Sequence, residues 1–357
     1  MRKHAGLLAA VLMAAVLLSG CGDQDKEFLK DIKAEDYVTL GNYKGIEASA
    51  QAPSVPDGQV DYYIEQQYLT PHMMTKEEAG RPVQEGDIAN IDFTGYQDGV
   101  AFPGGTGENY NLTIGSGQFI AGFEEGLVGV EIGETVRLAL KFPDPYNPNP
   151  DLSGAPVEFE VTVNGILPRL TDDFVKSLAV ADCQSVQALE DWVYDLYYQQ
   201  AQADFSNEIE RILSDKILAG CSFKKEMPEA LVSRYQQSIN ASMTLQANSY
   251  GMQLADFMQL QGLDEEGYRA EFKKAATEMA QRYIMYQAIA DIEGLVPTEE
   301  EVQEEIDTMV TIYGYASEEE LLQKESRENI SEDLMRKNVV AFLMENGDIQ
   351  KTETIVD

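Results

Sequence analysis

Histidine, cysteine and tryptophan are scarce in this 357-residue sequence, which contains two, three and one of them. His4 lies in an N-terminal leader, so His72 alone would have to serve a Ser-His-Asp triad, a Cys-His dyad or a zinc site. The sequence also lacks a P-loop, and "GSGQFIAG" fails the dinucleotide fingerprint at its third glycine position. Hydrolases, NTPases and dehydrogenases are therefore disfavoured, and we expect neither a metal nor a cofactor.

Basic residues are also few. The chain has 26 Lys and Arg against 62 Asp and Glu, a formal net charge of -36. A surface this negative repels nucleic-acid phosphates and anionic lipid headgroups. We expect a well-solvated secreted protein with no nucleic-acid partner. A surface that favours basic clients is the alternative.

The N-terminus has the form of a signal peptide. Arg2, Lys3 and His4 precede an apolar run, residues 5–18, that is short for a spanning helix. We expect residues 1–20 to be removed. The sequence Leu18-Ser19-Gly20-Cys21 resembles a bacterial lipobox, which implies cleavage before Cys21 and acylation of its thiol. Two or more acyl chains give a stable anchor, so the resemblance implies a lipid-anchored, extracytoplasmic bacterial protein with residues 21–36 as a tether. A plain secretion signal is the alternative.

Two further cysteines, Cys183 and Cys221, remain after lipidation of Cys21. In an oxidising compartment they can form a disulfide, or they can stay as two free thiols. The sequence leaves both alternatives open.

Three segments follow the tether. Residues 37–80 contain a strand, "YVTLGNYKGIEAS", and a helix in "VPDGQVDYYIEQQYL". Residues 81–168 alternate β-rich runs with turn signals, which predicts about five antiparallel strands, a hairpin at Asp98-Gly99 and a short helix in "GFEEGLVG". Residues 169–357 show helical periodicity throughout. The fold class is therefore α+β followed by an all-α region.

Start signals mark two of the C-terminal helices. Pro228 begins one of them, and Thr298 with Glu301 forms a capping-box pattern at another. Nine of the thirteen methionines lie between Met227 and Met344. Methionine fills irregular cores and is also overused on promiscuous binding surfaces, so core packing and client binding are both open, with core packing favoured.

Three motifs in the middle segment carry a family resemblance: "GDIANIDFTGYQDGVAFPGG", "IGSGQFIAGFEEGLVGVEIGE" and "LKFPDPY" followed by "VEFEVTVNGI". In this order they resemble the FKBP-type peptidyl-prolyl isomerase domain, in its trigger factor variety. The C-terminal stretches "EFKKAATEMAQRYIMYQAIADIEGLVPTEEEVQEEI" and "SEDLMRKNVVAFLMEN" resemble the trigger factor chaperone region. The resemblance implies an FKBP-like antiparallel sheet wrapped on a short helix at 81–168 and a helical chaperone domain at 169–357.

The basic loop signature of the family's ribosome-docking domain is missing from the sequence, and a lipobox leader stands in its place. We therefore expect no ribosome-bound role. The expected partners are unfolded or partly folded exported polypeptides, with the membrane reached through the lipid anchor.

The resemblance also implies which residues form the isomerase pocket. Phe123 would be the floor beneath the proline ring, Ile120 would offer its backbone N–H to the substrate, and Tyr146 would offer its hydroxyl to a substrate carbonyl. The implied catalytic set is Phe93, Phe102, Phe119, Ile120, Phe123, Tyr146 and Phe159, with Tyr110 as a further wall residue that binds substrate. Core packing is the alternative for each aromatic residue.

Two features depart from many FKBP domains. Pro103 stands where many of them have an aspartate, although trigger factors also lack that aspartate. The loop "FPDPYNPNPDLSGAP" carries five prolines, which makes the flap over the pocket stiff. Two hypotheses follow: a membrane-anchored prolyl isomerase and folding chaperone, or a holdase-type binding lipoprotein with an inactive isomerase-like domain.

Overall fold

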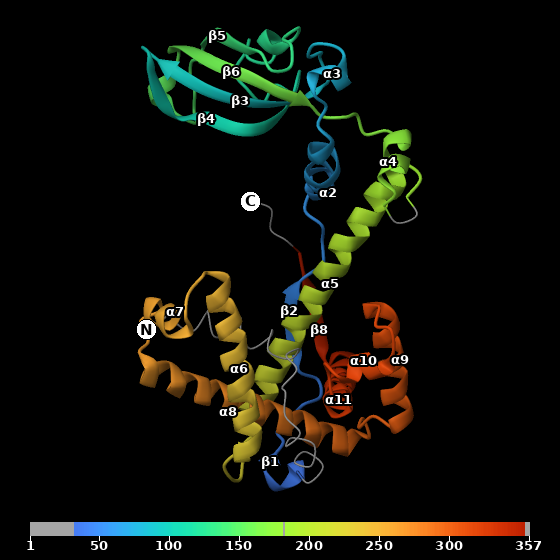
Figure 1. Ribbon diagram of the computed structural model, residues 1–357. Helices are drawn as coiled ribbons and strands as arrows, with labels where there is room; N and C mark the ends of the chain where they lie inside the picture. Colours follow the sequence, from blue (N-terminus) through green and yellow to red (C-terminus); the bar gives the residue numbers. More distant parts are fainter. Residues whose placement is uncertain (1–31, 181–182, 354–357) are drawn as a thin grey trace. The chain divides into compact units, whose positions relative to one another are not determined.

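The computed structural model describes residues 32–180 and 183–353 (Figure 1). The leader and the expected lipidation site, Cys21, lie outside the described residues. The chain divides into two compact units, residues 53–202 and residues 1–52 together with 203–357. We call them the sheet unit and the helical unit and describe each by itself. The division does not follow the expected boundaries at 80 and 168, because residues 53–80 and 169–202 are grouped with the sheet.

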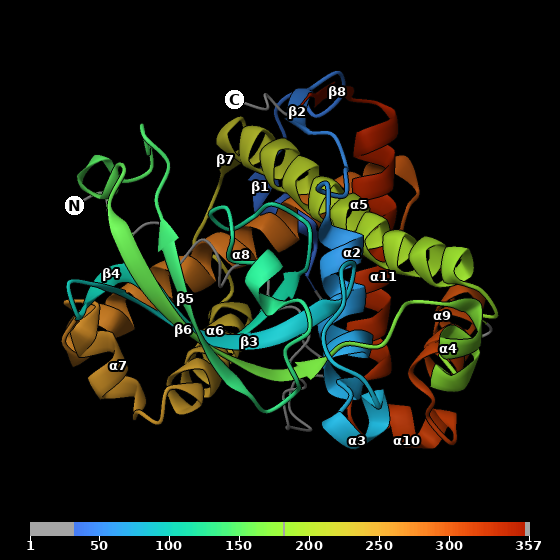
Figure 2. The same ribbon diagram turned by 90° about the horizontal axis from the view of Figure 1, so that it is seen from above.

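The sheet unit is built on four antiparallel strands in the order β4-β3-β6-β5. The strands are β3 (Ile88–Gln97), β4 (Val100–Thr113), β5 (Thr135–Lys141) and β6 (Pro156–Ile166), and Figure 2 shows their twist in a second view. Asp98 and Gly99 connect β3 to β4 with φ values of 50° and 79°, which confirms the predicted hairpin. The sheet has four strands where about five were expected, because residues 100–113 form one long strand whose pairing with β3 contains two register shifts.

The short helix expected at residues 122–129 is wrong in extent, because only one 3-10 turn forms there, η6 (Glu125–Leu127). Gly122 and Gly129 have φ values of 90° and 86°, which no regular right-handed helix contains. Leu127 from this turn and Phe123 just before it pack against the sheet and complete its core.

A second core in the sheet unit joins the connecting segments. It involves α2 (Gln59–Ile64), the π-helix η4 (Glu65–Leu69), α4 (Asp172–Leu178) and the start of α5 (Val186–Ala219). Two shorter elements, η5 (Thr70–His72) and α3 (Lys76–Ala79), lead into the sheet, and the 3-10 turn η7 (Pro150–Leu152) lies in the loop before β6. The expected helix after residue 56 is confirmed, and its last turns are π-helical.

Side-chain amides attach residues 59–72, which we call the connector, to the sheet. Asn164 donates to Asn90 (3.1 Å) and Asn90 donates to Asn111 (2.7 Å), so the amides form a row across three strands. Asn111 then donates to Glu65 (2.8 Å) and Thr70 (2.9 Å) of the connector. Every step is a paired polar contact, and Asn90 is only 2% exposed, so the row fixes the connector on this face of the sheet.

The helical unit contains the C-terminal part of α5 and most of the chain's helices. They are α6 (Glu229–Ser249), α7 (Leu254–Leu260), α8 (Glu265–Glu293), α9 (Glu299–Tyr313), α10 (Glu318–Leu322) and α11 (Arg327–Glu345). Pro228 precedes α6, and Thr298 and Glu301 form the predicted capping box of α9. Both predicted helix starts are confirmed.

Short strands tie the two ends of the helical unit together. After the 3-10 turn η3 (Ala34–Asp36), β1 (Val38–Thr39) pairs antiparallel with β7 (Ser222–Phe223), and β2 (Glu47–Gln51) pairs parallel with β8 (Asp348–Thr352). The predicted single strand at residues 37–49 is thus two short ones. They place an N-terminal segment beside elements more than 180 residues later in the sequence.

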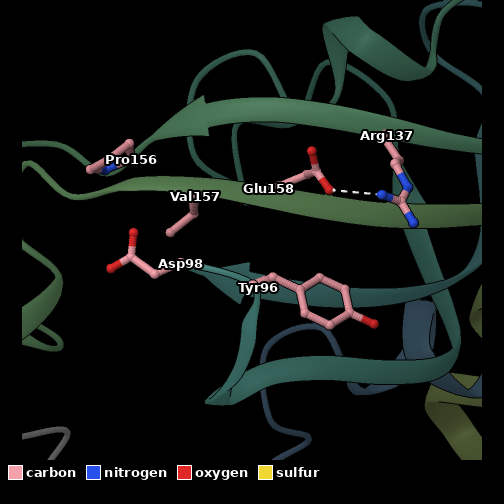
Figure 3. Close-up of a pocket in the computed structure, with 7 residues that line it drawn as sticks. Tyr96, Asp98, Arg137, Pro156, Val157 and Glu158 are labelled. Atoms are coloured by element: carbon pink, nitrogen blue, oxygen red, sulfur yellow. Dashed lines mark hydrogen bonds and ion pairs between the residues drawn. The ribbon is translucent and has the colours of Figure 1, made fainter.

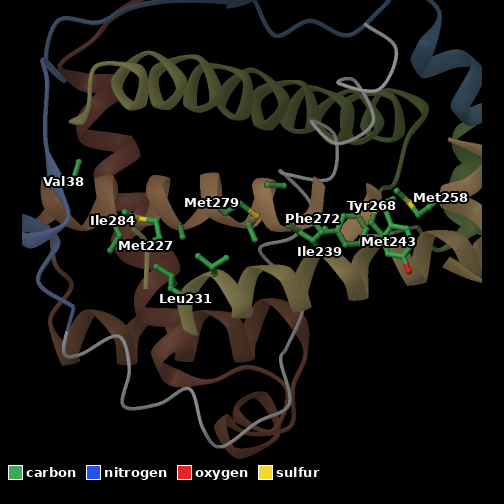
Figure 4. Close-up of a cluster of buried hydrophobic side chains, with 14 of the residues drawn as sticks. Val38, Met227, Leu231, Ile239, Met243, Met258, Tyr268, Phe272, Met279 and Ile284 are labelled. Atoms are coloured by element: carbon green, nitrogen blue, oxygen red, sulfur yellow. The ribbon is translucent and has the colours of Figure 1, made fainter. Parts of the chain in front are cut away.

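Most methionines of the helical unit are core residues. Met227, Met243, Met258 and Met279 are 1–8% exposed and belong to the core that α6, α7 and α8 share with Ile239 and other apolar side chains (Figure 4). The favoured interpretation, core packing, is confirmed for these four. Among the described residues, no helix has the length and hydropathy needed to cross a bilayer. Cys183 and Cys221 are both free thiols.

Candidate active site

Phenylalanine rings surround Phe123 on the inner side of the sheet. The Phe123 ring is stacked on Phe119, with 4.2 Å between centroids and 29° between planes. Phe159 and Phe93 meet it edge-on at 5.2 and 6.0 Å. Tyr110 extends the wall, 5.6 Å from Phe119. These edge-on and offset contacts are the favoured arrangements for aromatic pairs, so the rings form one connected cluster.

Glycines in β3 and β4 leave space for these rings. A Cβ at Gly95 would lie 2.5 Å from the Phe102 ring and 2.7 Å from the Phe159 ring. A Cβ at Gly107 would lie 2.6 Å from the Phe93 ring. Any side chain at these positions would displace a ring, so the cluster depends on these two gaps in the strands.

The other side of the cluster reaches the proline-rich flap. Phe102 contacts Phe159 (5.7 Å) and Phe142 (5.9 Å), and Phe142 contacts Tyr146 at 4.7 Å. The Tyr146 N–H donates to the Ser153 hydroxyl (2.8 Å), which holds the flap residue in place. The Tyr146 hydroxyl has no hydrogen-bond partner among residues 32–180 and 183–353. Phe142 was not among the predicted site residues, although it closes "LALKF", where apolar residues alternate toward the core.

Ile120 lies beside this cluster with its backbone donor free. Its carbonyl oxygen accepts from the Phe123 N–H (3.1 Å), and its side chain packs on the sheet core. The Ile120 N–H donates to no other group in the described part of the chain. All seven predicted catalytic residues, and Tyr110, are thus brought to one region of the sheet unit.

The carboxylate of Glu124 organises the loop before Ile120. Its Oε2 atom accepts from the N–H groups of Gly115 (2.8 Å) and Gly117 (3.0 Å). Its Oε1 atom accepts from the Phe119 N–H (3.2 Å) and the Ser116 hydroxyl (3.2 Å). Burial alone would raise the pKa of Glu124, but these hydrogen bonds outweigh it and hold the pKa below its ordinary value. Glu124 therefore stays ionised near neutral pH. It was not among the predicted residues.

The floor of the cluster is covered. Phe123 is 0% exposed, and the half-buried Phe119 ring lies directly against it. The Phe123 ring is therefore closed off from solvent in this structure.

A separate depression lies on the opposite face of the sheet (Figure 3). It is lined by Tyr96, Asp98, Gly99, Arg137, Pro156, Val157 and Glu158. Arg137 contacts Glu158 at 3.2 Å there. Glu158 and Phe159 are consecutive on β6, so their side chains point to opposite faces. This charged depression is not part of the aromatic cluster.

Comparison with known proteins matches two parts of the chain to protein families. Residues 79–164 match the family described as FKBP-type peptidyl-prolyl cis-trans isomerase, and residues 185–345 match the C-terminus of bacterial trigger factor protein. The trigger factor of Bacillus cereus (strain B4264) is 32% identical over 327 residues, which cover 90% of this chain and 75% of the relative. The chain belongs to the trigger factor family.

Other trigger factors agree. That of Clostridioides difficile (strain 630) is 31% identical over 325 residues, covering 89% of this chain and 74% of the relative. A solved structure from work on substrate recognition by the trigger factor chaperone covers 87% of this chain and 73% of its own, at 17% identity and a TM-score of 0.36, which is too low to compare the folds. Membership of the family supports prolyl isomerase activity, folding-chaperone activity and the binding of unfolded polypeptides in general.

The predicted fold class, an FKBP-like antiparallel sheet with a large helical region, is confirmed.

Proposed function

We propose that this trigger factor relative is a lipid-anchored prolyl isomerase and chaperone that acts on exported polypeptides at the bacterial cell envelope. The observation that carries the isomerase part is the closed aromatic cluster beside a free Ile120 N–H. The N-terminal lipobox resemblance supports the anchor. The proposed envelope location places the protein away from ribosomes, the partner typical of the family.

The reaction needs no nucleophile. Rotation about a peptide bond must overcome a barrier of about 18–20 kcal/mol, because the planar amide loses its resonance on twisting. A dry apolar pocket that holds the pyrrolidine ring favours the twisted amide over the planar one, which is differential binding of the transition state. Lowering the barrier by about 1.4 kcal/mol increases the rate tenfold. A site made of rings and two hydrogen-bond donors is therefore sufficient.

We propose that Phe123, Ile120 and Tyr146 hold the prolyl residue and its neighbouring carbonyls, and that four further aromatic residues line the site. Phe123 would lie beneath the prolyl ring once Phe119 has turned aside. The free Ile120 N–H would donate to a substrate carbonyl and fix the chain across the pocket. Phe93, Phe102, Phe159 and Tyr110 would form the walls, and the free Tyr146 hydroxyl would donate to a carbonyl from the flap side.

The second candidate is a holdase whose isomerase-like domain is inactive. It is favoured by one observation, the complete burial of Phe123, against which the Phe119 ring is stacked. If Phe123 stays buried, no proline reaches the floor, and only binding by other surfaces remains.

The decisive experiment is refolding of a proline-limited client with catalytic amounts of the soluble chain, residues 22–357. The wild type should accelerate the slow phase. Tyr146→Phe keeps the ring contact with Phe142 and removes the hydroxyl, and should reduce the acceleration about fivefold, since a hydrogen bond contributes about 1 kcal/mol. Tyr96→Phe, on the opposite face, is the matched control and should have no effect.

Suppression of client aggregation is measured in the same samples. It should be equal in all three proteins, because the helical unit is untouched. A wild type that suppresses aggregation but leaves the slow phase at its uncatalysed rate would establish the holdase.

The anchor is tested separately with the full precursor expressed in a bacterium. We expect the wild type to sediment with membranes and Cys21→Ser to be released, because the thiol that carries the lipid is gone. Cys221→Ser is the control and should remain in the membrane fraction. Equal release of wild type and Cys21→Ser would show that the leader is a plain secretion signal.

A further inference from the structure

The buried carboxylate of Glu124 determines the conformation of the loop that precedes Ile120. It is 4% exposed, and its two oxygens accept four hydrogen bonds from residues 115–119. One of these donors is the backbone N–H of Phe119, the residue whose ring covers Phe123. The next residue along the chain is Ile120, whose N–H is free. One carboxylate therefore fixes the backbone immediately before the two groups that a substrate must meet.

Glu124 accepts four of the hydrogen bonds that define the shape of this loop. The Ser116 N–H also donates to the Thr113 carbonyl (3.1 Å), and two longer contacts of 3.4 Å join Gln118 to the hydroxyls of Ser116 and Tyr110. Gly115 and Gly117 have φ values of 94° and 72°, a region that glycine enters without strain but that also gives the unfolded loop many alternatives. Their N–H groups both converge on the Oε2 atom of Glu124. The carboxylate thus selects one of many conformations that the glycines permit.

We propose that Glu124 is a positioning residue for prolyl isomerisation, which holds the backbone of the 115–119 loop so that the Phe119 backbone and the Ile120 N–H keep their places beside the aromatic cluster. This inference rests on the proposed isomerase function. Glu124 does not touch the substrate; it acts through the backbone of Phe119.

A neutral side chain of the same size cannot replace the carboxylate. In Glu124→Gln the single amide oxygen can still accept from Gly115 and Gly117. The amide NH2 group then faces the Ser116 hydroxyl and the Phe119 N–H, which both donate to the carboxylate in the wild type. The Ser116 hydroxyl can rotate and accept, but the Phe119 N–H meets another donor and loses its partner. The substitution is nearly isosteric and removes one identifiable hydrogen bond.

The test combines refolding catalysis with hydrogen–deuterium exchange in the soluble chain, residues 22–357. Glu124→Gln should reduce catalytic efficiency about tenfold, because hydrogen bonds to charged groups are among the stronger ones. Exchange should become faster in peptides that cover residues 115–120 and stay unchanged in those that cover β3 and β6. Glu85→Gln is the matched control. This exposed carboxylate lies beside Gly115 and accepts none of the loop N–H groups in the described structure.

A double variant distinguishes positioning from general stability. Once Phe119→Ala has removed the covering ring, Glu124→Gln should cost clearly less than its tenfold effect in the wild type, because part of its role is to place that ring. Equal costs in both backgrounds, or an unchanged rate in Glu124→Gln despite faster loop exchange, would overturn the positioning role. A wild type that catalyses no isomerisation would overturn the proposed function and this role with it, whereas unchanged loop exchange would overturn this role alone.

Discussion

Two carboxylates, Glu124 in the sheet unit and Glu332 in the helical unit, are held in different ways. In the sheet unit, Glu124 takes all its partners from one neighbouring loop, and three of them are backbone N–H groups. In the helical unit, Glu332 of α11 pairs instead with Arg234 of α6, at 2.8 and 3.2 Å. Glu124 is thus held mainly by backbone donors of one loop, whereas Glu332 is held by a long side chain from a separate helix.

The cores of the two units also differ, in the rigidity of the side chains that fill them. The aromatic cluster is made of rigid rings that fit into gaps left by Gly95 and Gly107. The core between α6 and α8 is rich in methionine, which has three rotatable side-chain bonds and adapts to its surroundings. We therefore expect the sheet unit to be sensitive to small changes in shape. The helical unit should tolerate them in its core but depend on the charges that join its helices.

The largest expected effect is the loss of the pair between α6 and α11. Glu332→Ala leaves the Arg234 guanidinium, whose side chain is 22% exposed, without its bidentate partner. Removing one member of a partly buried ion pair of this kind costs up to about 3 kcal/mol. Hydrogen exchange in α6 and α11 should accelerate accordingly, while exchange in the sheet stays unchanged. Because the chain has two units, this local measurement is more informative than a single melting temperature.

The matched control is an exposed pair in the same unit. Arg269 contacts Glu265 one helical turn away, and their side chains are 69% and 66% exposed. Arg269→Gln should leave hydrogen exchange in the helical unit nearly unchanged, because such exposed pairs are screened by water. Equal effects of Glu332→Ala and Arg269→Gln would mean that the interhelical pair does not set the spacing of α6 and α11.

A smaller effect is expected from adding one carbon to the sheet. Gly95→Ala places a Cβ where the Phe102 and Phe159 rings now lie, 2.5 and 2.7 Å away. Overpacking of this kind costs about 2 kcal/mol, and displacement of two pocket rings should also abolish catalysis of the refolding phase. Thr94→Ala, at the adjacent position facing the other side of the sheet, is the control. Retention of full catalysis by Gly95→Ala would show that the rings are not held by this gap.

Asp87 gives the sheet unit a pH dependence. Burial would raise its pKa, but hydrogen bonds from Arg81 (2.5 and 2.8 Å) and the Gln84 N–H (2.9 Å) outweigh burial and lower it. A carboxyl with a lowered folded-state pKa stabilises the fold above its unfolded pKa of about 3.9, and this stability is lost as the pH falls through the folded pKa.

The stability difference between wild type and Asp87→Asn should therefore be largest near neutral pH and shrink below about pH 4. Exchange of β3 at several pH values measures it, with each rate corrected for the intrinsic pH dependence of exchange. Other carboxylates titrate equally in both proteins and cancel. A difference that stays constant down to low pH would mean that the ionised form of Asp87 adds no stability.

Local signals made much of the fold predictable. The Asp98-Gly99 hairpin, the capping box at Thr298 and the helix start at Pro228 depend on a few adjacent residues, and all three are confirmed. The helix expected at residues 122–129 failed because its pattern of apolar residues is helical while its glycines adopt positive φ. The grouping of residues 169–202 with the sheet unit depends on long-range packing, which no local pattern records.

The candidate site was predictable in its aromatic residues and not in what holds them. The motif resemblance identified the rings, and the structure places them together. Glu124 was missed because one glutamate in an acidic chain gives no signal until the loop folds back onto it. The covering of Phe123 by Phe119 depends on side-chain conformation, which sequence spacing does not determine.

The methionine core gives the smallest expected effect. Met243 is 1% exposed between α6 and α8, so Met243→Leu changes shape in a fully enclosed position. Volume-conserving swaps of this kind usually cost less than about 1.5 kcal/mol, and neighbouring methionines can move to fill the space. We therefore expect little change in the exchange of α6 and α8. Phe159→Leu in the sheet unit is the counterpart and should cost more, because it removes edge-on contacts to Phe102 and Phe123 that no neighbour can replace. If Met243→Leu proves the more damaging of the two, the helical core is as rigidly fitted as the aromatic one, and its methionines are there for shape rather than adaptability.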